Sequence, residues 1–359
     1  MAHYRKSVFL SVLSLPIGLA AERNFRRLPR LQAQPIINQL PALSIIIPAR
    51  DEAQNLHSLF PSLVTLDYPG DIEILLVDDH SSDSTAQVAA SFGVRVLSLE
   101  EELPQGWKGK PFACHQGALN TTGEWILFTD ADTVHSSCGI PSAVYYAIQL
   151  RLDGVSLFLK HQPASWLERL TLDTAFAGLF ANWHASRFLL NGQFILVRRE
   201  VYFRSGGFES VRNEMLEDVA LGNLMETSGY RFQMMNGGNA AHVRMYSSYE
   251  NMFQGLSRLG SGMLGWQGIW AGLTVLYVTA VVSPLVTLPG VLKGKLKWFW
   301  FPVSWGSATL SLFPWSRRSG SGKLALLAPL GGVIILSSAL LGLLSRLFKR
   351  GIPWKGRPV

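Results

Sequence analysis

Two carboxylates separated by a single alanine, Asp130 and Asp132, stand in the stretch LFTDADTVHS. The apolar run from Trp125 to Phe128 lies just before them and indicates a buried strand. Ligands collect beyond the carboxyl ends of strands in open α/β sheets, so this strand would deliver both carboxylates to a ligand site. Two like charges this close need a counter-charge, which either a divalent metal ion or a salt bridge to Lys or Arg would supply.

Acidic residues recur where other predicted strands end. The segments are PARDE (Pro48 to Glu52), VDDHSSDST (Val77 to Thr85) and NEMLEDVALG (Asn213 to Gly222). A solvated surface would instead place its charges along the outer faces of helices. The pattern therefore predicts that carboxylates gather at one edge of a sheet.

The elements that must position these groups alternate along the chain. Short apolar runs that resemble strands are LSIIIP from Leu43, IEILLVDD from Ile72, VRVLSL from Val94 and EWILFTDAD from Glu124. Helical patterns lie between them at residues 55–66, 84–91 and 110–120. Strands that alternate with helices at this spacing predict an α/β domain with a mostly parallel sheet, over about residues 43–245.

The composition points to a membrane protein. Of the 359 residues, 48% are hydrophobic and only 16% are charged, and the mean hydropathy is +0.19. The net charge is +7, but the basic residues cluster at the edges of apolar segments, which favours anionic lipid headgroups over DNA or RNA. We therefore expect the lipid bilayer, and no nucleic acid, as a partner. The two cysteines, Cys114 and Cys138, are expected in the core.

Apolar segments flank the predicted α/β domain. At the N-terminus (residues 1–30), the run Val8 to Ala21 has about fourteen residues and contains Pro16, whereas a span needs roughly 17–25. We expect a short membrane anchor or interfacial helix there, interrupted by this proline, with the basic residues after it holding the next domain on the cytoplasmic side.

The C-terminal region, residues 263–345, is expected to hold about three spans, followed by a basic tail at residues 346–359. Residues 265–292 and 324–344 are long enough to cross a bilayer, whereas residues 296–313 are marginal. Their topology stays open, because basic residues occur in both intervening loops.

One aromatic-rich stretch, His161 to His184, lies inside the predicted α/β domain. It is consistent with a buried or partner-facing helix. It is equally consistent with an amphipathic helix that rests on the membrane near an acceptor entrance.

In their order along the chain, the acidic segments resemble an inverting glycosyltransferase of family 2, whose nucleotide-sugar-binding, Rossmann-like fold is called GT-A. The resemblance covers residues 43–260. The flanking membrane segments are similar to the membrane-bound subgroup that glycosylates lipids, including hopanoid- or carotenoid-associated and, more distantly, ceramide glycosyltransferases. The resemblance implies a multi-pass protein of the cell membrane with a cytoplasmic catalytic domain. Its expected partners are a nucleotide-sugar donor, for which we expect a UDP-sugar, and the hydroxyl of a membrane lipid.

The resemblance also implies a metal ion and a donor-binding loop. Asp132 would ligate Mg²⁺ or Mn²⁺, and Asp130 would contact the ribose or reach the metal through water; taken alone, the pair could also cap a helix. Asp79 matches the position that accepts a hydrogen bond from the nucleotide base. The residues that match the first nucleotide-contacting loop are Pro48, Ala49, Arg50 and Glu52.

The remaining site residues would serve the diphosphate and the acceptor. In GWKGKPFACHQG, Lys110 resembles a family position near the nucleotide, and Lys108 is expected to be solvated. Inverting transfer needs one general base for the acceptor hydroxyl, and by resemblance this base is Asp218, with Glu217 in support. Arg258 would contact the diphosphate, although its spacing from Gln254 departs from that of processive synthases.

Two other functions fit parts of the pattern. A nucleotidyltransferase can use a similar sheet and metal carboxylates, but it would need a glycine-rich loop where this chain has IIIPARDE. A non-catalytic membrane scaffold with a degenerate fold would have no chemical need for both Asp132 and Asp218. We therefore expect a metal-dependent hexosyltransferase.

Overall fold

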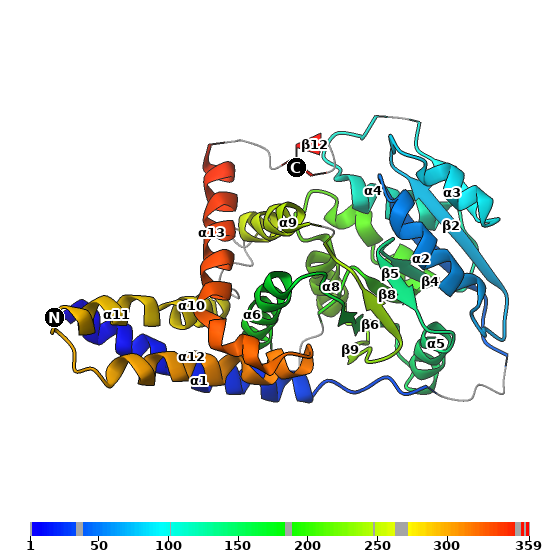
Figure 1. Ribbon diagram of the computed structural model, residues 1–359. Coiled ribbons are helices and arrows are strands. Elements are labelled where there is room, and N and C mark those ends of the chain that lie inside the picture. Colours follow the sequence, from blue (N-terminus) through cyan, green and yellow to red (C-terminus); the bar gives the residue numbers. More distant parts are fainter. Residues whose placement is uncertain are drawn as a thin grey trace. The chain divides into compact units, whose positions relative to one another are not determined.

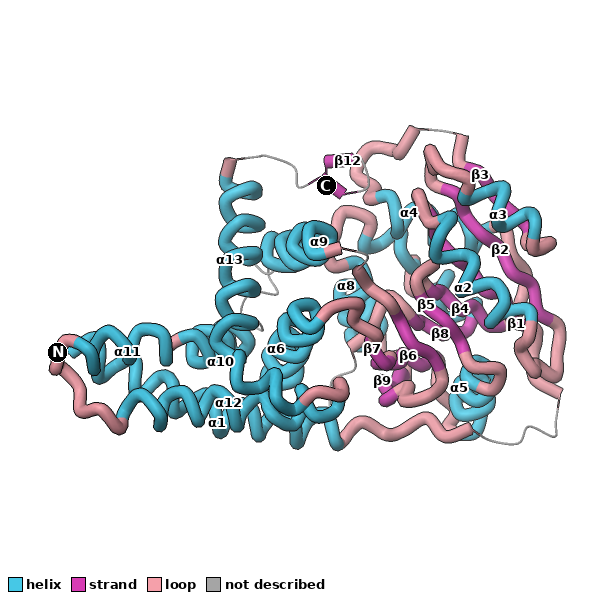
Figure 2. Tube along the Cα trace, in the orientation of Figure 1, coloured by secondary structure: helices cyan, strands magenta, loops and turns pink. Residues whose placement is uncertain are grey.

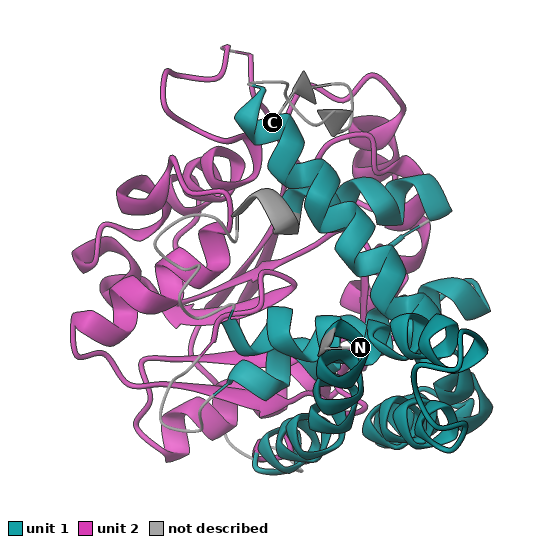
Figure 3. Ribbon diagram, turned by 90° about the vertical axis from the view of Figure 1, so that its left-hand side faces the viewer, with its two compact units in different colours: residues 1–27, 163–186, 246–359 teal, residues 28–162, 187–245 magenta. Residues whose placement is uncertain are grey.

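The computed structural model describes residues 2–33, 39–100, 102–183, 189–246, 248–262, 272–348, 353–354 and 357–358. The chain forms two compact units, coloured separately in Figure 3. Residues 28–162 and 187–245 form the sheet unit, and residues 1–27, 163–186 and 246–359 form the helical unit. This division differs from the expected boundaries at 43 and 260, because residues 163–186 and those from 246 onward cluster with the helical unit. Residues 263–271 and most of the predicted basic tail lie outside the described residues.

The sheet unit is built on a seven-stranded, mostly parallel sheet, as predicted (Figures 1 and 2). Its strands are β1 (Leu43–Ala49), β2 (Ile72–Asp78), β3 (Arg95–Ser98), β4 (Trp125–Thr129), β6 (Gly154–Phe158), β8 (Phe194–Arg198) and β9 (Phe232–Asn236). They lie in the order β3-β2-β1-β4-β8-β6-β9, and only β8 runs antiparallel to its neighbours β4 and β6. A second sheet joins β5 (Thr133–His135), β10 (Ala241–Val243) and β7 (Lys160–His161).

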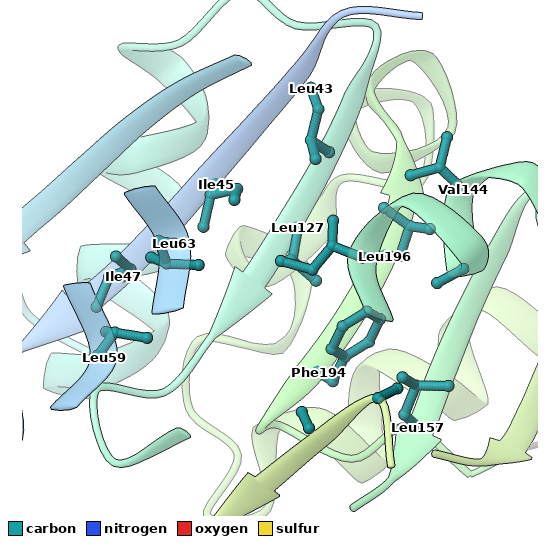
Figure 4. Packing of buried hydrophobic residues seen from close by; sticks show 14 of the residues in the cluster. Leu43, Ile45, Ile47, Leu59, Leu63, Leu127, Val144, Leu157, Phe194 and Leu196 are labelled. Atoms are coloured by element: carbon teal, nitrogen blue, oxygen red, sulfur yellow. The ribbon is translucent and has the colours of Figure 1, made fainter. Parts of the chain in front are cut away.

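Helices cover both faces of the larger sheet. They are α2 (Ala53–Val64), α3 (Thr85–Ser91), α4 (Gly109–Leu119), α5 (Gly139–Gln149), α7 (Arg199–Arg204) and α8 (Glu217–Thr227), with a 3-10 turn, η1, at Gly207–Val211. Successive residues of β1 face opposite cores: Ile45 packs with Leu59 of α2 (Figure 4), whereas Ile46 packs in the cluster that includes Leu221 of α8. Both isoleucines are fully buried, and each such side chain contributes about 1.5–3 kcal/mol.

The parallel register brings three strand ends to one edge. In β1 and β2, Ala49 pairs with Asp78, and in β1 and β4, Ile46 pairs with Phe128. The loops that follow these three strands therefore start at nearly the same level of the sheet. This is the edge at which the acidic segments were expected to meet.

The helical unit contains three helices that are long and apolar enough to cross a membrane, among the described residues. They are His3–Arg26, Gly272–Leu292 and Gly322–Leu347, and they indicate membrane association. The elements of this unit are α1 (Ala2–Arg26), α6 (Trp166–Asn182), α9 (Tyr249–Gly262), α10 (Gly272–Val282), α11 (Pro284–Leu292), α12 (Trp300–Arg318), η3 (Gly322–Leu327), α13 (Ala328–Leu347), β11 (Pro353–Trp354) and β12 (Arg357–Pro358).

The candidate spans are distributed differently from the sequence expectation. The interruption expected at Pro16 is wrong, because α1 is continuous through this proline and reaches spanning length. A proline costs a helix one backbone hydrogen bond but does not have to end it, least of all in an apolar helix with packed neighbours. The marginal segment 296–313 lies largely in α12, which is not among the three candidates.

The aromatic-rich stretch forms α6, and the structure supports the buried alternative for it. Ser165 caps the helix by accepting a hydrogen bond from Glu168 N, as in a capping box. The helix packs against α1, α10 and α13 within its own unit, and both apolar and polar residues of it are buried, among them Leu170, Asp173 and Phe180. His184, at the end of the stretch, lies outside the described residues.

Asp173 of α6 gives the helical unit a testable pH dependence. Its side chain is 5% exposed, and burial raises its pKa from the ordinary 3.8 to about 6, against the opposing effect of a hydrogen bond from Ser319. The folded chain therefore binds this proton more tightly than the unfolded chain, so stability is lost as pH rises from about 4 to above 6. Asp173→Asn should raise the free energy of unfolding at pH 7.5 by about 1–3 kcal/mol and flatten this slope.

Thermal unfolding of the detergent-solubilised chain between pH 4.5 and 8 measures the effect. Asp71→Asn, at an exposed carboxyl of the sheet unit, is the matched control and should leave the slope unchanged. Equal slopes for wild type and Asp173→Asn would contradict the assignment.

Candidate active site

The loops after β1 and β2 hold each other in place. The Arg50 guanidinium donates through Nη1 to the backbone carbonyl of Asp79 at 2.9 Å, and Asp79 N donates to Ala49 O at 2.8 Å. Asp51 Oδ1 accepts bonds from the backbone N and the Oγ of Ser82, at 2.7 and 2.9 Å. These bonds hold the loop after β1 and the loop after β2 together.

Asp79, the carboxylate predicted to bind the nucleotide base, is buried where the loops after β1 and β2 meet. Asp79 is 7% exposed, and its Oδ1 lies 3.0 Å from Nδ1 of His80. Asp78, 8% exposed, accepts a bond from Ser81 N through Oδ1 at 3.1 Å. His80 and Asp51 both have positive φ, at 58° and 51°, so the two turns are strained backbone held by these side-chain bonds.

The other predicted members of the first loop have different surroundings. Pro48 and Ala49 form the end of β1 and pair with Val77 and Asp78. Glu52 precedes α2, and its Oε2 accepts a bond from Nδ2 of Asn55 at 2.6 Å. Their backbone thus borders the site, whereas the Glu52 carboxylate is directed to the start of its own helix.

Lys110 supplies the counter-charge for the acidic pair after β4. Its Nζ lies 2.6 Å from Asp130 Oδ1 and 3.9 Å from Glu217 Oε1. Burial alone would lower the pKa of Lys110, but the two carboxylates outweigh burial and raise it. Lys110 is thus a counter-charge for Asp130, one of the two aspartates.

Asp218 is held beside the same ammonium group by backbone bonds. Gly192 N donates to Asp218 Oδ2 at 2.9 Å, and Val219 N donates to Oδ1 at 2.8 Å. A Cβ atom added to Gly192 would lie 3.1 Å from Lys110 Nζ and 3.3 Å from Asp218 Oδ2. Burial raises the pKa of Asp218, and Lys110 offsets part of that rise. Asp218 thus has both features of the expected base: a fixed carboxylate and a raised proton affinity.

Asp132 and Arg258 complete the predicted set. Asp132 lies between β4 and β5, and its backbone carbonyl accepts a bond from Arg244 N at 3.2 Å, so the main chain at this position is fixed. Arg258 lies on α9 in the helical unit, apart from the unit that holds all the other predicted residues. The structure therefore joins Lys110, Asp130, Glu217 and Asp218 in one cluster within the sheet unit.

Sequence reasoning missed Gly192 and the contribution of Asp51. Gly192 has no side chain, and nothing in the sequence shows that its backbone N–H binds Asp218 or that a Cβ atom there would meet Lys110. Asp51 was visible as an acidic turn residue beside a second Asp/Ser-rich turn, a composition that favours side-chain to backbone bonds. That signal indicates a turn, but it does not identify the loop on the other side.

The acidic pair can accept a hard divalent cation if a ligand completes the coordination. Carboxylate oxygens are the ligands that Mg²⁺ and Mn²⁺ prefer. In the described part of the chain, no group of three or more His, Cys, Asp or Glu side chains is arranged to hold a metal ion. Asp130 and Asp132 are thus two carboxylates of the kind that such an ion binds.

Comparison with protein families and curated proteins identifies relatives. The profile described as glycosyl transferase family 2 matches residues 44–220, which includes all the predicted site residues except Arg258. A 4,4'-diaponeurosporenoate glycosyltransferase of Staphylococcus aureus strain USA300 is 27% identical over 254 residues, which are 65% of this chain and 64% of that protein. The protein of the same name from strain MRSA252 is 26% identical over 284 residues, 74% of this chain and 73% of its own length. The chain thus spans less than two thirds of the first of these relatives.

Comparison with solved structures gives the fold. A mannosyltransferase from Pyrobaculum calidifontis, solved in complex with GDP-Man and Mn²⁺, superposes with a TM-score of 0.58 and 16% identity. The superposition covers 97% of this chain and 99% of that one. The sheet unit therefore has the GT-A fold, as the sequence predicted.

Proposed function

Because the chain belongs to glycosyltransferase family 2, we propose that it is an inverting, metal-dependent enzyme that moves a sugar from a UDP-sugar to the hydroxyl of a membrane lipid. The observation that carries the proposal is the cluster of Lys110, Asp130, Glu217 and Asp218 beside the ends of the parallel strands. The Asp218 carboxylate, whose proton affinity is raised, suits removal of a proton, and the nearby Lys110 ammonium suits a diphosphate leaving group.

In this proposal the donor binds over the joined loops after β1 and β2. The buried Asp79 carboxylate accepts a hydrogen bond from the nucleotide base, and Arg50, Pro48, Ala49 and Glu52 border the nucleotide. The strained, pre-formed turns support this, since a site that is already ordered loses little entropy when the donor binds. The Pyrobaculum mannosyltransferase holds GDP-Man in the same fold, which supports a nucleotide-sugar donor.

Asp132 and Asp130 would hold the Mg²⁺ or Mn²⁺ ion together with the donor diphosphate. Such an ion supplies Lewis-acid stabilisation of the charge that grows on the leaving diphosphate. The Mn²⁺ in the Pyrobaculum complex supports this assignment. Arg258 remains a proposed diphosphate contact.

Asp218 would take the proton of the acceptor hydroxyl as that hydroxyl attacks the anomeric carbon from the side opposite the diphosphate. Its two backbone bonds leave acceptor capacity on both oxygens, because a carboxylate has about four lone-pair positions. Glu217 would support it through the shared Lys110. This geometry suits a base that is held in place.

A membrane lipid is the proposed acceptor, and a carotenoid, hopanoid or other isoprenoid is the proposed class. The three candidate spans would keep the chain where such a lipid diffuses. Large apolar side chains on α1, such as Phe9 at 68% and Leu19 at 53% exposed, suit a lipid-facing surface. The names of the Staphylococcus aureus relatives support a carotenoid-related lipid in particular. We propose a multi-pass location in the cell membrane with the catalytic unit in the cytoplasm.

Donor-binding calorimetry on the detergent-purified chain tests the donor part of this proposal. UDP-, GDP- and dTDP-sugars are titrated with Mn²⁺ and then without it. We expect one nucleotide class to bind, with UDP-sugars favoured, and only when the metal is present. Folded chain that binds none of these donors under either condition would contradict the proposed function.

A further inference from the structure

One ammonium group is shared by a proposed metal ligand and by the proposed base. Lys110 Nζ lies 2.6 Å from Asp130 Oδ1 and 3.9 Å from Glu217 Oε1. It is also close to Asp218, because a Cβ atom added to Gly192 would lie within 3.1 Å of Lys110 Nζ and within 3.3 Å of Asp218 Oδ2. Three carboxylates from two segments, the loop after β4 and the start of α8, therefore converge on a single cation. The proposed reaction assigns Lys110 to the nucleotide and leaves its contact with Asp130 unexplained.

The ammonium is paired with one oxygen of the carboxylate that would bind the metal ion. A divalent ion bound by Asp130 would sit about 2.0–2.2 Å from a carboxylate oxygen, within the same few ångströms that the Lys110 ammonium fills. Two cations this close repel each other strongly where the surroundings are partly desolvated, and only 25% of the Asp130 side chain is exposed. Simultaneous binding of both cations at Asp130 is therefore unfavourable unless further negative charge arrives.

We propose that Lys110 is a built-in competitor of the metal ion for Asp130, so that the chain binds its metal tightly only together with the donor diphosphate. This inference rests on the proposed function. Without a donor, Lys110 neutralises Asp130 and keeps divalent cations weakly bound. The diphosphate brings negative charge that can receive the ammonium, which releases Asp130 to the metal.

The surroundings of Lys110 permit this exchange. Its side chain is 36% exposed, and Glu217 offers a second carboxylate 3.9 Å away. The missing side chain at Gly192 leaves the space beside the ammonium open, whereas any Cβ atom there would press on it. The ammonium can therefore change partners without unfolding helix α4, which carries it.

Mn²⁺ binding to the full chain in detergent, monitored by electron paramagnetic resonance in the absence of nucleotide, tests whether Lys110 competes with the metal ion for Asp130. We expect Lys110→Met to bind Mn²⁺ at least about tenfold more tightly than wild type, because a positive charge beside the ion has been removed. Lys110→Arg keeps the charge and should behave like wild type. Lys108→Met, two residues away at the start of α4, is the matched control and should also leave Mn²⁺ affinity unchanged.

Two additions make the result specific. In the Lys110→Met background, Asp130→Asn should remove the gain, which assigns the new affinity to Asp130. Adding UDP should raise the Mn²⁺ affinity of wild type by a larger factor than that of Lys110→Met, because binding of the two ligands is coupled through Lys110. Lys110→Gln is read in the same way as Lys110→Met and serves if the methionine variant does not fold.

The outcomes separate this inference from the proposed function. The competition would be overturned if Lys110→Met and Lys110→Gln bound Mn²⁺ no more tightly than wild type. In that case, UDP-dependent Mn²⁺ binding by wild type would still support the proposed function. Wild type that binds Mn²⁺ equally well with and without UDP would also overturn the competition. No Mn²⁺ binding to any variant, even with UDP, would overturn the metal requirement itself and this inference with it.

Discussion

Replacing Asp218 by Asn is expected to abolish sugar transfer and to leave donor binding intact. The amide has the shape of the carboxylate and keeps an oxygen for the bond from Gly192 N, so the loop geometry should survive. It cannot accept the acceptor proton, however, and loss of a general base typically costs about 10²–10⁴-fold in rate. Steady-state transfer measured beside donor calorimetry separates the two effects.

The pH profile adds a second signature of this residue. Because burial raises the pKa of Asp218, the base is lost to protonation at a higher pH than an ordinary aspartate would be. The acid limb of kcat/KM should therefore lie above the usual range of an aspartate carboxyl. Glu217→Gln is the neighbouring control and should reduce transfer far less. Wild-type turnover by Asp218→Asn would assign the base elsewhere.

Replacing Asp132 by Ala is expected to remove metal-dependent donor binding and to lower the rate of sugar transfer by at least about 10³-fold. A metal ion that stabilises the leaving group contributes several kcal/mol, and each 1.4 kcal/mol changes the rate by about tenfold. The main chain at this position is held by its own bond to Arg244 N, which the substitution does not touch. The loss should therefore reflect the carboxylate and not the fold. Calorimetry with a UDP-sugar and Mn²⁺ measures it, with thermal unfolding to verify that the variant is folded.

Asp130→Asn is the informative comparison for Asp132→Ala. It removes the oxygen paired with Lys110, so it should weaken donor binding while leaving part of the metal dependence carried by Asp132. Donor binding by Asp132→Ala with an unchanged response to Mn²⁺ would show that the acidic pair is held only by the lysine and that the metal, if used, binds elsewhere.

The strands and the edge at which they end could be predicted from the sequence because both signals are local. The apolar run from Leu43 becomes β1, and the run before Asp130 becomes β4, each ended by polar residues. Parallel pairing then brings the two ends together without any knowledge of side-chain contacts. The identity of the acidic edge followed from periodicity and from the general behaviour of α/β sheets.

The contacts within the cluster could not be predicted in the same way. Lys110 was expected near the nucleotide, but its partners Asp130 and Glu217 lie 20 and 107 residues further along the chain, and only the folded structure sets these distances. Gly192 shows the same limit, because its importance lies in the space it leaves beside two distant side chains.

The boundary between the units was also beyond local reasoning. The stretch that forms α6 lies between strands of the sheet unit in the sequence, yet it packs with α1, α10 and α13 of the helical unit. Its low charge was visible, but a helix buried in protein and a helix resting on a membrane have similar composition. Tertiary contacts distinguish them, and these come from segments that lie far away along the chain in both directions.

Transfer of labelled sugar to lipid is the measurement that tests the central claim most directly. Wild type and Asp218→Asn are reconstituted in vesicles that carry a hydroxylated carotenoid, a hydroxylated hopanoid or a polyprenol. A radiolabelled UDP-sugar is then added with Mn²⁺ or with a chelator. We predict that label enters the organic-solvent extract only with wild type and only with the metal. Label that stays in the aqueous phase with every lipid, although the donor binds, would contradict a lipid acceptor, and equal labelling by Asp218→Asn would contradict the proposed base.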